Sequence, residues 1–471
     1  MFTTIVVFLC ELTGFLTALK AIMETRTAQG TIAWAVSLIA LPYVAVPAYW
    51  IFGRTKFAGY VTARRAQMLR SNALARKLAE EFDRRRMQTK AGRSEEILLE
   101  RLAKLPFTAH NRATLLIDGE DTFASIFEAI AAAKKYVLVQ FYIIHDDGLG
   151  GRLRDALIAK AREGVRCCVL FDEIGSGRLK AYCAALRAAG VRIEPFHTTK
   201  GIANRLQLNF RNHRKIVVVD GLVAFVGGHN VGDEYLGLDR KVGPWRDTHV
   251  KVEGPVVQCV QVSWVEDWHW ATGEETPDLN WNPVGARDGH GGALCLPSGP
   301  ADDLETATLF FLHAINSAKE RLWIASPYFV PDEQFISALQ LAALRGVDVR
   351  ILTPVKPDNA MVRLSAFSYL PETEAVGIKW FRHQVGFMHQ KVMLVDDDYC
   401  AIGTANFDNR SFRLNFEITM AFYEKDFAQQ VAAMLEKDFA KSIPAHACEL
   451  TGASFWFRLN VRIARLMSPV Q

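Results

Sequence analysis

The chain contains a long internal duplication, whose clearest part is a short pattern of histidine and lysine. The segment Asn212–Asp220 (NHRKIVVVD) recurs as Met388–Asp396 (MHQKVMLVD). Both copies read H-x-K-x4-D, and their histidines lie 389 − 213 = 176 residues apart. At the same offset, Gly227–Asn230 (GGHN) recurs as Gly403–Asn406 (GTAN). Because such a matched pair is improbable by chance, we interpret the chain as two related halves that each supply part of one site.

The segments around the two motifs repeat the same order of predicted strands and helices. From about Leu105, apolar runs rich in β-branched residues alternate with segments of helical periodicity. The strand-helix-strand predictions are 136–144, 151–162 and 165–171 in the first half, and 321–326, 332–345 and 347–353 in the second. Such units place helices on the faces of a sheet. The expected fold is α/β, with two similar αβα sandwich halves related by a pseudo-two-fold axis.

Two apolar stretches precede these halves and predict a transmembrane helical hairpin. The stronger stretch, Thr31–Phe52, carries no charge and is long enough to span a bilayer. The weaker stretch, Phe2–Ile22, is interrupted by Glu11 and Lys20. A cleaved signal peptide is the alternative, but the chain lacks a basic start and a small-residue cleavage site.

A basic segment follows the second stretch and predicts the orientation of the chain. Its cations are Arg54, Lys56, Arg64, Arg65, Arg70, Arg76, Lys77 and Arg84–Arg86. Positive loops stay on the inner side of a membrane, so we expect the following halves in the cytoplasm. The segment would also attract anionic headgroups, although an ordinary solvated linker helix fits it as well.

The cysteine spacing and the net charge argue against a zinc site and a nucleic-acid partner. None of the eight cysteines forms a C-x-x-C pair, so we expect reduced, mostly buried thiols and no zinc site. The net charge of +4 gives no reason to expect a nucleic-acid partner.

The predicted domain boundaries follow these patterns. They are 1–53 for the hairpin, 54–104 for the basic linker or helix, 105–272 for the first half, 273–299 for a linker rich in Gly, Pro, Asn and Asp, 300–447 for the second half and 448–471 for an amphipathic tail. The tail segment Phe455–Leu466 mixes apolar residues and arginines at helical spacing. It fits a helix on a membrane surface and a helix docked on the core equally well.

Residue spacing predicts how each motif is presented. Residues two apart on a strand share a face, so His213 points with Lys215 and His389 with Lys391. The Asp220-Gly221 pair predicts a hairpin turn that brings position 228 opposite position 213. The return strands then place Gly228 and Asn230, or Thr404 and Asn406, beside the histidines. Glycine allows close backbone approach, asparagine and threonine offer amide and hydroxyl groups, and lysine offers ammonium charge. Together these groups predict a phosphate site in each half.

The two imidazoles predict the chemistry of phosphodiester cleavage. One histidine can attack phosphorus, while the other protonates the leaving alkoxide and then activates an acceptor hydroxyl. We see no carboxylate cluster that would hold a metal, and we expect no metal or cofactor. Asp247 and Glu417 are the predicted partners that fix the tautomers of His213 and His389, which they follow by 34 and 28 residues (247 − 213; 417 − 389). His229 and His249 lie near the motif and are further candidates.

Several longer phrases resemble the phospholipase D superfamily and, within it, the bacterial cardiolipin synthases. They are RNHRKIVVVDG, GGHNVGDEYLG, WRDTHVKVEGP, MHQKVMLVDD and GTANFDNRSFRLNFE, and the likeness extends over nearly the whole chain. It implies a phospholipase D-like catalytic unit in a multi-pass protein of the bacterial inner (plasma) membrane. The implied reaction transfers a phosphatidyl group between two phosphatidylglycerol molecules to give cardiolipin and glycerol.

The resemblance also assigns roles to the motif residues. His213 would form the phosphohistidine, and His389 would act as acid and then base. Lys215, Lys391, Asn230 and Asn406 would hold the phosphate, while Asp220 and Asp396 complete the catalytic motif and support its structure. The chain departs from the family pattern at His229, where an aliphatic residue is expected, and at Met388, which stands where the first motif has Asn212.

Four alternative functions remain open. The chain could be a phospholipase D-type hydrolase, or a phosphatidyltransferase with another donor or acceptor such as phosphatidylethanolamine. A nuclease of the same superfamily is disfavoured by the predicted membrane segments. A non-catalytic scaffold is disfavoured because both His-Lys pairs are intact.

Overall fold

The computed structural model describes residues 2–24, 27–53, 74, 76–89, 94–177, 179–196, 210–276 and 278–471. Most of the predicted basic segment, including Arg54, Lys56, Arg64, Arg65 and Arg70, lies outside these residues. Its described end is helical at 76–84.

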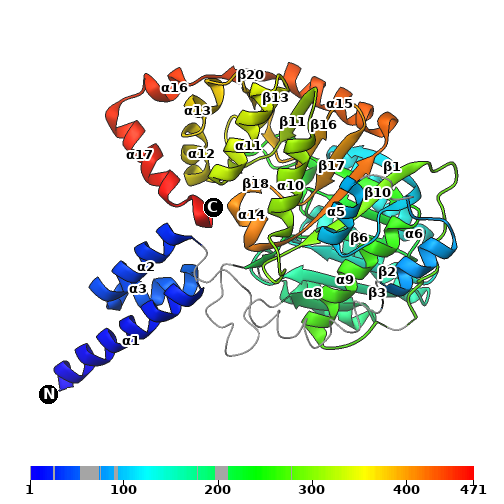
Figure 1. Ribbon diagram of the computed structural model, residues 1–471. Coiled ribbons are helices and arrows are strands. Elements are labelled where there is room, and N and C mark those ends of the chain that lie inside the picture. Colours follow the sequence, from blue (N-terminus) through cyan, green and yellow to red (C-terminus); the bar gives the residue numbers. More distant parts are fainter. Residues whose placement is uncertain are drawn as a thin grey trace.

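The first half is a seven-stranded region of sheet with helices on both faces (Figure 1). Its strands run in the order β1-β9-β7-β6-β2-β3-β4. They are β1 (Thr108–Ile117), β2 (Tyr136–Phe141), β3 (Arg166–Asp172), β4 (Arg192–Phe196), β6 (Ile216–Val219), β7 (Val223–Gly227) and β9 (Thr248–Glu253). Alternate strand residues enter two separate cores, one with α6 (Asp118–Ala132), α7 (Gly148–Arg162) and α8 (Lys180–Ala188), the other with α9 (Val256–Thr272).

The second half repeats this strand order as β10-β19-β17-β16-β11-β13-β14 and adds β20 at the edge. Its strands are β10 (Gly291–Ser298), β11 (Arg321–Ala325), β13 (Asp348–Pro354), β14 (Lys379–His383), β16 (Val392–Val395), β17 (Tyr399–Gly403), β19 (Asn415–Tyr423) and β20 (Ser442–Ala445). Its larger helices are α10 (Thr306–Ser317), α11 (Glu333–Leu344), α12 (Ala360–Phe367), α13 (Leu370–Glu374) and α15 (Lys425–Ala440). The predicted pair of α/β halves is confirmed.

The two halves join through an antiparallel contact between β1 and β10, so one sheet runs through both. Residues 291–298, which the sequence placed at the end of a linker, therefore form a central strand. The apolar run Ala293–Leu296 is fully buried between β1 and β19, and a buried apolar run favours a strand over a solvated linker.

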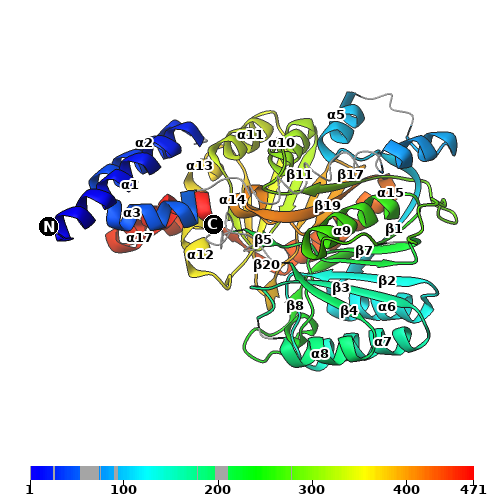
Figure 2. The same ribbon diagram turned by 90° about the horizontal axis from the view of Figure 1, so that it is seen from below.

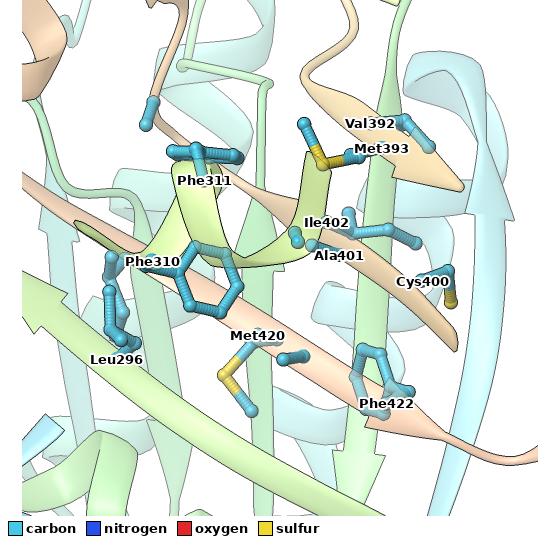
Figure 3. Packing of buried hydrophobic residues seen from close by; sticks show 14 of the residues in the cluster. Leu296, Phe310, Phe311, Val392, Met393, Cys400, Ala401, Ile402, Met420 and Phe422 are labelled. Carbon is cyan, nitrogen blue, oxygen red and sulfur yellow. The ribbon is translucent and has the colours of Figure 1, made fainter. Parts of the chain in front are cut away.

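Helix α10 closes the core of the second half (Figure 3). Phe310 and Phe311 lie against side chains of β10, β16, β17 and β19, among them Leu296, Met393 and Met420. The two phenylalanine rings lie edge to face with centroids 5.1 Å apart. This packing fixes β16, the strand that lies between Lys391 and Asp396 of the second motif.

The N-terminal segment forms α1 (Phe2–Glu24), α2 (Ala28–Ala40), α3 (Pro42–Ala48) and the π-helical turn η1 (Tyr49–Gly53). The stretch 31–52 is not one continuous helix, because α2 ends at Leu41, whose φ and ψ are −137° and 58°. Pro42 lacks the N–H that would continue the helix and begins α3 instead. Among the described residues, α1 is the helix long and apolar enough to cross a membrane.

The apolar helices nevertheless pack on one another as a hairpin does. A Cβ at Gly14 would lie 2.5 Å from the carbonyl oxygen of Leu38, so glycine lets α1 approach α2 closely. Ala18, Ala21, Leu38, Ala45 and Tyr49 form a small buried cluster between them.

Short elements complete the described structure. They are α5 (Ser94–Ala103), β5 (Arg211–Asn212), η3 (Asp233–Leu236), β8 (Trp245–Arg246), β12 (Phe329–Val330), β15 (Phe387–Met388), β18 (Phe407–Asp408), α14 (Asn409–Arg413), α16 (Cys448–Thr451), α17 (Phe455–Leu466) and η4 (Ser468–Val470). Six of the eight cysteines are buried and all are free, which confirms mostly buried thiols.

Candidate active site

Each histidine motif is tied to the opposite half of the molecule by backbone pairing. Strand β5, just before His213, pairs in parallel with β19, and β15, just before His389, pairs with β8. The His213 N–H donates to the carbonyl of Phe416 at 2.9 Å, and the His389 N–H donates to that of Arg246 at 2.8 Å. The two motifs therefore cross over and meet between the halves.

This exchange decides which carboxylate holds which histidine. Nδ1 of His213 lies 2.9 Å from Oε2 of Glu417, and Nδ1 of His389 lies 2.8 Å from Oδ2 of Asp247. The sequence correctly selected both carboxylates, but its pairing of Asp247 with His213 and of Glu417 with His389 is wrong. Spacing within a half carries no information about strands that cross between halves.

Two of the residues predicted as phosphate ligands, Gly228 and Thr404, lie against the carboxylates. The Thr404 hydroxyl donates to Glu417 Oε2 at 2.6 Å, and Asn415 Nδ2 donates to Oε1 at 3.1 Å. In the other half, a Cβ at Gly228 would lie 2.0 Å from Oδ1 of Asp247. Gly228 thus makes room for one carboxylate, while Thr404, at the equivalent position, fixes the other.

The two predicted phosphate-binding asparagines differ from each other. Oδ1 of Asn230 accepts the N–H of Ile143 at 3.1 Å, and its Nδ2 donates to the Tyr235 hydroxyl at 3.0 Å. Both ends of Asn230 are therefore engaged by the protein. Oδ1 of Asn406 is buried and has no hydrogen-bond partner within the described part of the chain, so this amide retains an unused polar atom.

Both motif lysines are buried beside their histidines. Lys215 Nζ donates to the His213 carbonyl at 2.7 Å, and Lys391 Nζ donates to that of His389. Burial lowers the pKa of Lys215 well below its ordinary value. Burial also lowers the pKa of Lys391 to about 8, although Asp247 and Glu417 oppose the shift. Near pH 7 Lys391 therefore keeps most of its charge.

Burial also keeps both motif histidines neutral at pH 7. It lowers the pKa of His213 to about 4 against the opposing effect of Glu417, and that of His389 to about 4 with the help of Lys391 and against Asp247. The charge of Lys391 acts on His213 and that of Lys215 acts on His389. The two motifs therefore share one electrostatic environment.

The carboxylates select the tautomer of each neutral ring. A carboxylate is a stronger acceptor than any neutral group, so Nδ1–H of each histidine donates to its carboxylate. Lys391 Nζ lies 2.9 Å from Nδ1 of His389. Because Nδ1 carries the proton in this tautomer, Nζ donates to the His389 carbonyl instead. Nε2 of both histidines is left as a lone-pair donor, and each side chain is 10% exposed.

The motif aspartates lie in the turns at the far ends of the strands. The Asp220 carboxylate accepts the N–H groups of Lys134, Lys135 and Tyr136, each at 2.8 Å. Asp396 likewise accepts those of Lys319, Glu320 and Arg321 at 2.8–3.1 Å. This geometry fits the supporting role that the resemblance implies for both aspartates.

The turn at Asp220 also shifts the predicted register by one residue. Val219 pairs with Val223, so residues 220–222 form the loop and position 213 faces 229 by extension. Asp220 has a φ of 54° and Gly221 of 66°. These left-handed conformations make a three-residue loop. In the second copy residues 396–398 form the turn, since Val395 pairs with Tyr399.

Aromatic rings beside the histidines were not predicted as part of the site. The Tyr142 ring lies 5.1 Å from that of His213, and the Trp245 ring lies 5.1 Å from that of His389. Trp245 is separated from Asp247 by one residue in WRDTH, a signal that could have identified it. Tyr142 follows β2 and carries no comparable signal.

His229 and His249 form a buried pair behind this site. Their Nδ1 atoms lie 3.3 Å apart. Burial lowers the pKa of His229 to about 4 and that of His249 well below its ordinary value. Nε2 of His229 is buried and lacks a hydrogen-bond partner in the described residues. Both rings are neutral packing elements next to Asp247, whose charge acts on each.

One group in the described residues has the composition of a cation site. His145, Asp147 and Glu234 bring one ligand atom each within 4.8 Å of one another. The Asp147 oxygens already accept the N–H groups of Gly150 and Asp233, and His145 pairs with Glu234. The group therefore satisfies itself as the N-terminal cap of α7.

Known proteins match this chain over almost its entire length. The family model described as "Cardiolipin synthase, PLD-like domain" matches residues 126–243 and 311–439, and that described as "Phospholipase_D-nuclease N-terminal" matches residues 14–54. The chain is 49% identical over 468 residues to "Cardiolipin synthase A" of Pseudomonas entomophila, covering 98% of this chain and 97% of the relative. The protein of the same name from Pseudomonas fluorescens is 48% identical, covering 97% and 96%.

A solved structure supports the fold independently. The crystal structure of phosphatidylserine synthase from Haemophilus influenzae Rd KW20 has a TM-score of 0.59 at 16% identity, covering 80% of this chain and 100% of the other. The duplicated family match, the full-length relatives and the crossed histidine motifs lead to the same conclusion. The chain belongs to the cardiolipin synthases of the phospholipase D superfamily.

Proposed function

We propose that this phosphatidyltransferase moves a phosphatidyl group from one phosphatidylglycerol molecule to a second, giving cardiolipin and glycerol. Its relatives carry the name cardiolipin synthase, which implies phospholipid substrates. The observation that carries the proposal is the crossed pair of neutral imidazoles, each held through Nδ1 by a carboxylate. This arrangement provides one nucleophile and one acid-base group in a single site.

In the first step, Nε2 of His213 attacks the phosphorus of the first lipid. The bond between phosphorus and the glycerol headgroup oxygen breaks, and His389 gives its proton to that oxygen. Glycerol leaves, and the phosphatidyl group stays on His213 as a cationic phosphohistidine that Glu417 stabilises. Although His389 is neutral in the empty site, the anionic phosphodiester raises its pKa and favours the protonated form.

In the second step, the now neutral His389 removes a proton from the headgroup hydroxyl of a second phosphatidylglycerol. That oxygen attacks phosphorus, the bond between phosphorus and Nε2 breaks, and cardiolipin forms. His389 regains its proton and His213 its lone pair, so the cycle balances without a metal or cofactor. We assign three groups to the phosphate: Lys215, Lys391 and, after rotation of the Asn406 amide, its Nδ2, which then donates to a phosphate oxygen.

We place the protein in the bacterial plasma membrane as a multi-pass chain, with its catalytic halves in the cytoplasm. Support comes from the apolar helix α1, the packed segment α2–α3 and the excess of arginine and lysine over 54–86. We infer no nucleic-acid substrate from a chain with a net charge of only +4. The proposed domain limits stay those of the sequence, except that the second half begins at β10.

The products formed from a single lipid test the proposed reaction. Purified protein supplied with phosphatidylglycerol alone should give cardiolipin and glycerol in equal amounts, measured by mass spectrometry and a glycerol assay. Formation of phosphatidic acid without cardiolipin would instead establish a hydrolase. Activity should persist in a chelator, and cleavage of added DNA would contradict the assignment.

Trapping the intermediate tests the assignment of the two histidines. After acid quenching with radiolabelled lipid, His213→Ala should carry no label and form no product. His389→Ala should turn over slowly but still accept label. Label that requires His389 and not His213 would reverse the two roles.

A further inference from the structure

The C-terminal helix α17 is anchored to the second half by one of its faces. Val461 and Ala464 are buried, and the Phe457 ring packs edge to face on Phe367 of α12 at 5.3 Å. Arg465 pairs with Glu372 at 2.7 Å and lies over the Tyr369 ring. This face docks on the core, which is one of the two alternatives that the sequence left open.

A second apolar face of the same helix is exposed. Phe455, Trp456, Ile463 and Leu466 are 62%, 70%, 51% and 78% exposed, and Leu459 lies between them half-buried. At 100° per residue these side chains fall within about 100° of the helix circumference. Aromatic and aliphatic groups gathered in one stripe are not the scattered apolar residues of an ordinary surface.

The border of this stripe is positively charged. Arg458 and Arg462 follow one edge, are exposed and make no ion pair within the described residues. The helix contains no Asp or Glu. An apolar stripe flanked by arginines is complementary to a bilayer surface with anionic headgroups, because acyl chains take the stripe and phosphates take the guanidinium groups.

The position of α17 in the molecule agrees with such a surface. In both views α17 lies on the side from which α1, α2 and α3 project (Figures 1 and 2). Helix α17 therefore lies on the same side of the molecule as the candidate membrane helix α1. A bilayer that receives α1 would already lie close to α17. A second protein is therefore not needed to cover the exposed stripe.

We propose that α17 is an interfacial membrane helix. Phe455, Trp456, Ile463 and Leu466 enter the boundary between headgroups and acyl chains of an anionic bilayer, while Val461 and Ala464 hold the helix on the second half. The inference concerns membrane contact and does not depend on the reaction proposed above.

The helix is also connected to the site through its C-terminal turn. The Arg410 N–H donates to the carbonyl of Gln471 at 2.8 Å, and Asn409 Nδ2 donates to that of Ser468 at 3.1 Å. Both donors belong to α14, which begins three residues after Asn406. A bilayer-bound α17 would therefore hold the neighbourhood of Asn406 at a fixed height above the lipid surface.

A depth measurement on the full-length protein tests this proposal. In a background of Cys10→Ser and Cys448→Ser, Ile463→Cys carries an environment-sensitive fluorophore, and the protein is placed in nanodiscs of phosphatidylglycerol and phosphatidylcholine. Acyl chains brominated near the headgroup should quench this probe severalfold, while aqueous iodide should quench it weakly. A matched probe at Asp155→Cys, exposed on α7, should show the reverse.

Two results would overturn the proposal. One is strong iodide quenching at position 463, equal to that at position 155, with no effect of brominated lipid. The other is disulfide crosslinking between two copies at position 463 without lipid quenching, which would make the stripe a contact between chains. Ile463→Cys is a conservative change at an exposed position, so we expect the variant to fold. The quenching results then report on the surroundings of position 463.

A kinetic measurement shows whether the contact matters for turnover. Trp456→Glu combined with Leu466→Glu should raise KM for bilayer phosphatidylglycerol at least tenfold and leave turnover of detergent-dispersed lipid within about twofold. Leu344→Glu, exposed on α11, serves as the control and should change neither. Unchanged bilayer kinetics in the double variant would contradict a membrane role for the stripe, even if the reaction itself is as proposed.

Discussion

The chemistry of each histidine depends on a carboxylate from the opposite half. Glu417 holds His213 and is itself held by Thr404 and Asn415, whereas Asp247 holds His389 beside Lys391. His213, the proposed nucleophile, is thus oriented by a glutamate that is itself hydrogen-bonded. His389, the proposed acid-base group, has a cation beside it, and that cation favours loss of its proton.

Crossed pairing predicts different defects for the two carboxylate variants. With a phosphodiester whose nitrophenyl leaving group needs no protonation, Glu417→Gln should slow labelling of His213 about 100-fold, since a charge-assisted hydrogen bond of about 2–3 kcal/mol is lost. Asp247→Asn should label normally and fail mainly with phosphatidylglycerol. Rapid-quench labelling measures both rates, and the opposite pattern would restore the pairing expected from sequence.

Gly228 predicts a sharp steric effect at the second carboxylate. The Cβ of Gly228→Ala would meet Oδ1 of Asp247 at 2.0 Å, so the carboxylate must leave His389 and synthesis should fall at least 100-fold. Gly151→Ala on α7, where the nearest atom is 3.7 Å from the added Cβ, is the matched control and should retain full activity. Equal activity of the two variants in a cardiolipin assay would show that Asp247 is not needed where it lies.

At the scale of elements, both motif aspartates fasten a turn to the start of a neighbouring strand. Asp220 and Asp396 each accept three backbone N–H groups. Because unpaired N–H groups next to a buried strand are costly, these acceptors fix where β2 and β11 begin relative to β6 and β16.

The turn geometry predicts a loss of stability without a loss of chemistry. Asp220→Ala should lower the free energy of unfolding by about 2–3 kcal/mol, because three N–H groups lose their acceptor. The folded fraction should still form the phosphohistidine at a near-normal rate. Denaturant unfolding followed by active-site titration separates the two quantities, and a stable but unlabelled variant would return Asp220 to the catalytic residues.

Local patterns predicted the elements well and the exchange between them poorly. The strand at 136–141, the helix at 148–162 and their counterparts in the second half follow from alternation and periodicity within a few residues. The two-residue strands β5 and β8 are too short to leave a pattern, and their partners lie in the other half. Both carboxylates that the sequence selected, Asp247 and Glu417, contact a motif histidine, but each contacts the histidine of the opposite half.

The second apolar stretch shows a similar limit. Its composition predicted one span, but Pro42 divides it into α2 and α3. Hydropathy averages over a window and does not register the N–H that a proline removes.

For the whole molecule, the buried histidines predict acid sensitivity. Burial lowers the pKa of His213, His229 and His389 to about 4, below the ordinary 6.5, and lowers that of His249 well below its ordinary value. Between these values the unfolded chain binds more protons than the folded one. The stabilising contribution of the neutral rings is therefore complete above pH 6.5 and declines as the pH falls toward 4, by up to about 1.4 kcal/mol per histidine for each pH unit.

Unfolding free energies measured at pH 7, 6, 5 and 4.5 should follow this decline. His229→Leu removes one titrating ring from the interior, so its curve should be shallower than that of the wild type. A pH-independent stability over this window, or an unchanged slope in His229→Leu, would mean that these rings are protonated in the folded protein.

The exchange of carboxylates between halves has a consequence for how such a chain could arise. A polypeptide with only the first half would carry His213 without Glu417 and Asp247 without His389. Two copies related by a two-fold axis would supply each missing partner to the other. The present chain therefore has the organisation of a gene-fused homodimer, in which the two copies now differ: one histidine is held by a glutamate and the other by an aspartate.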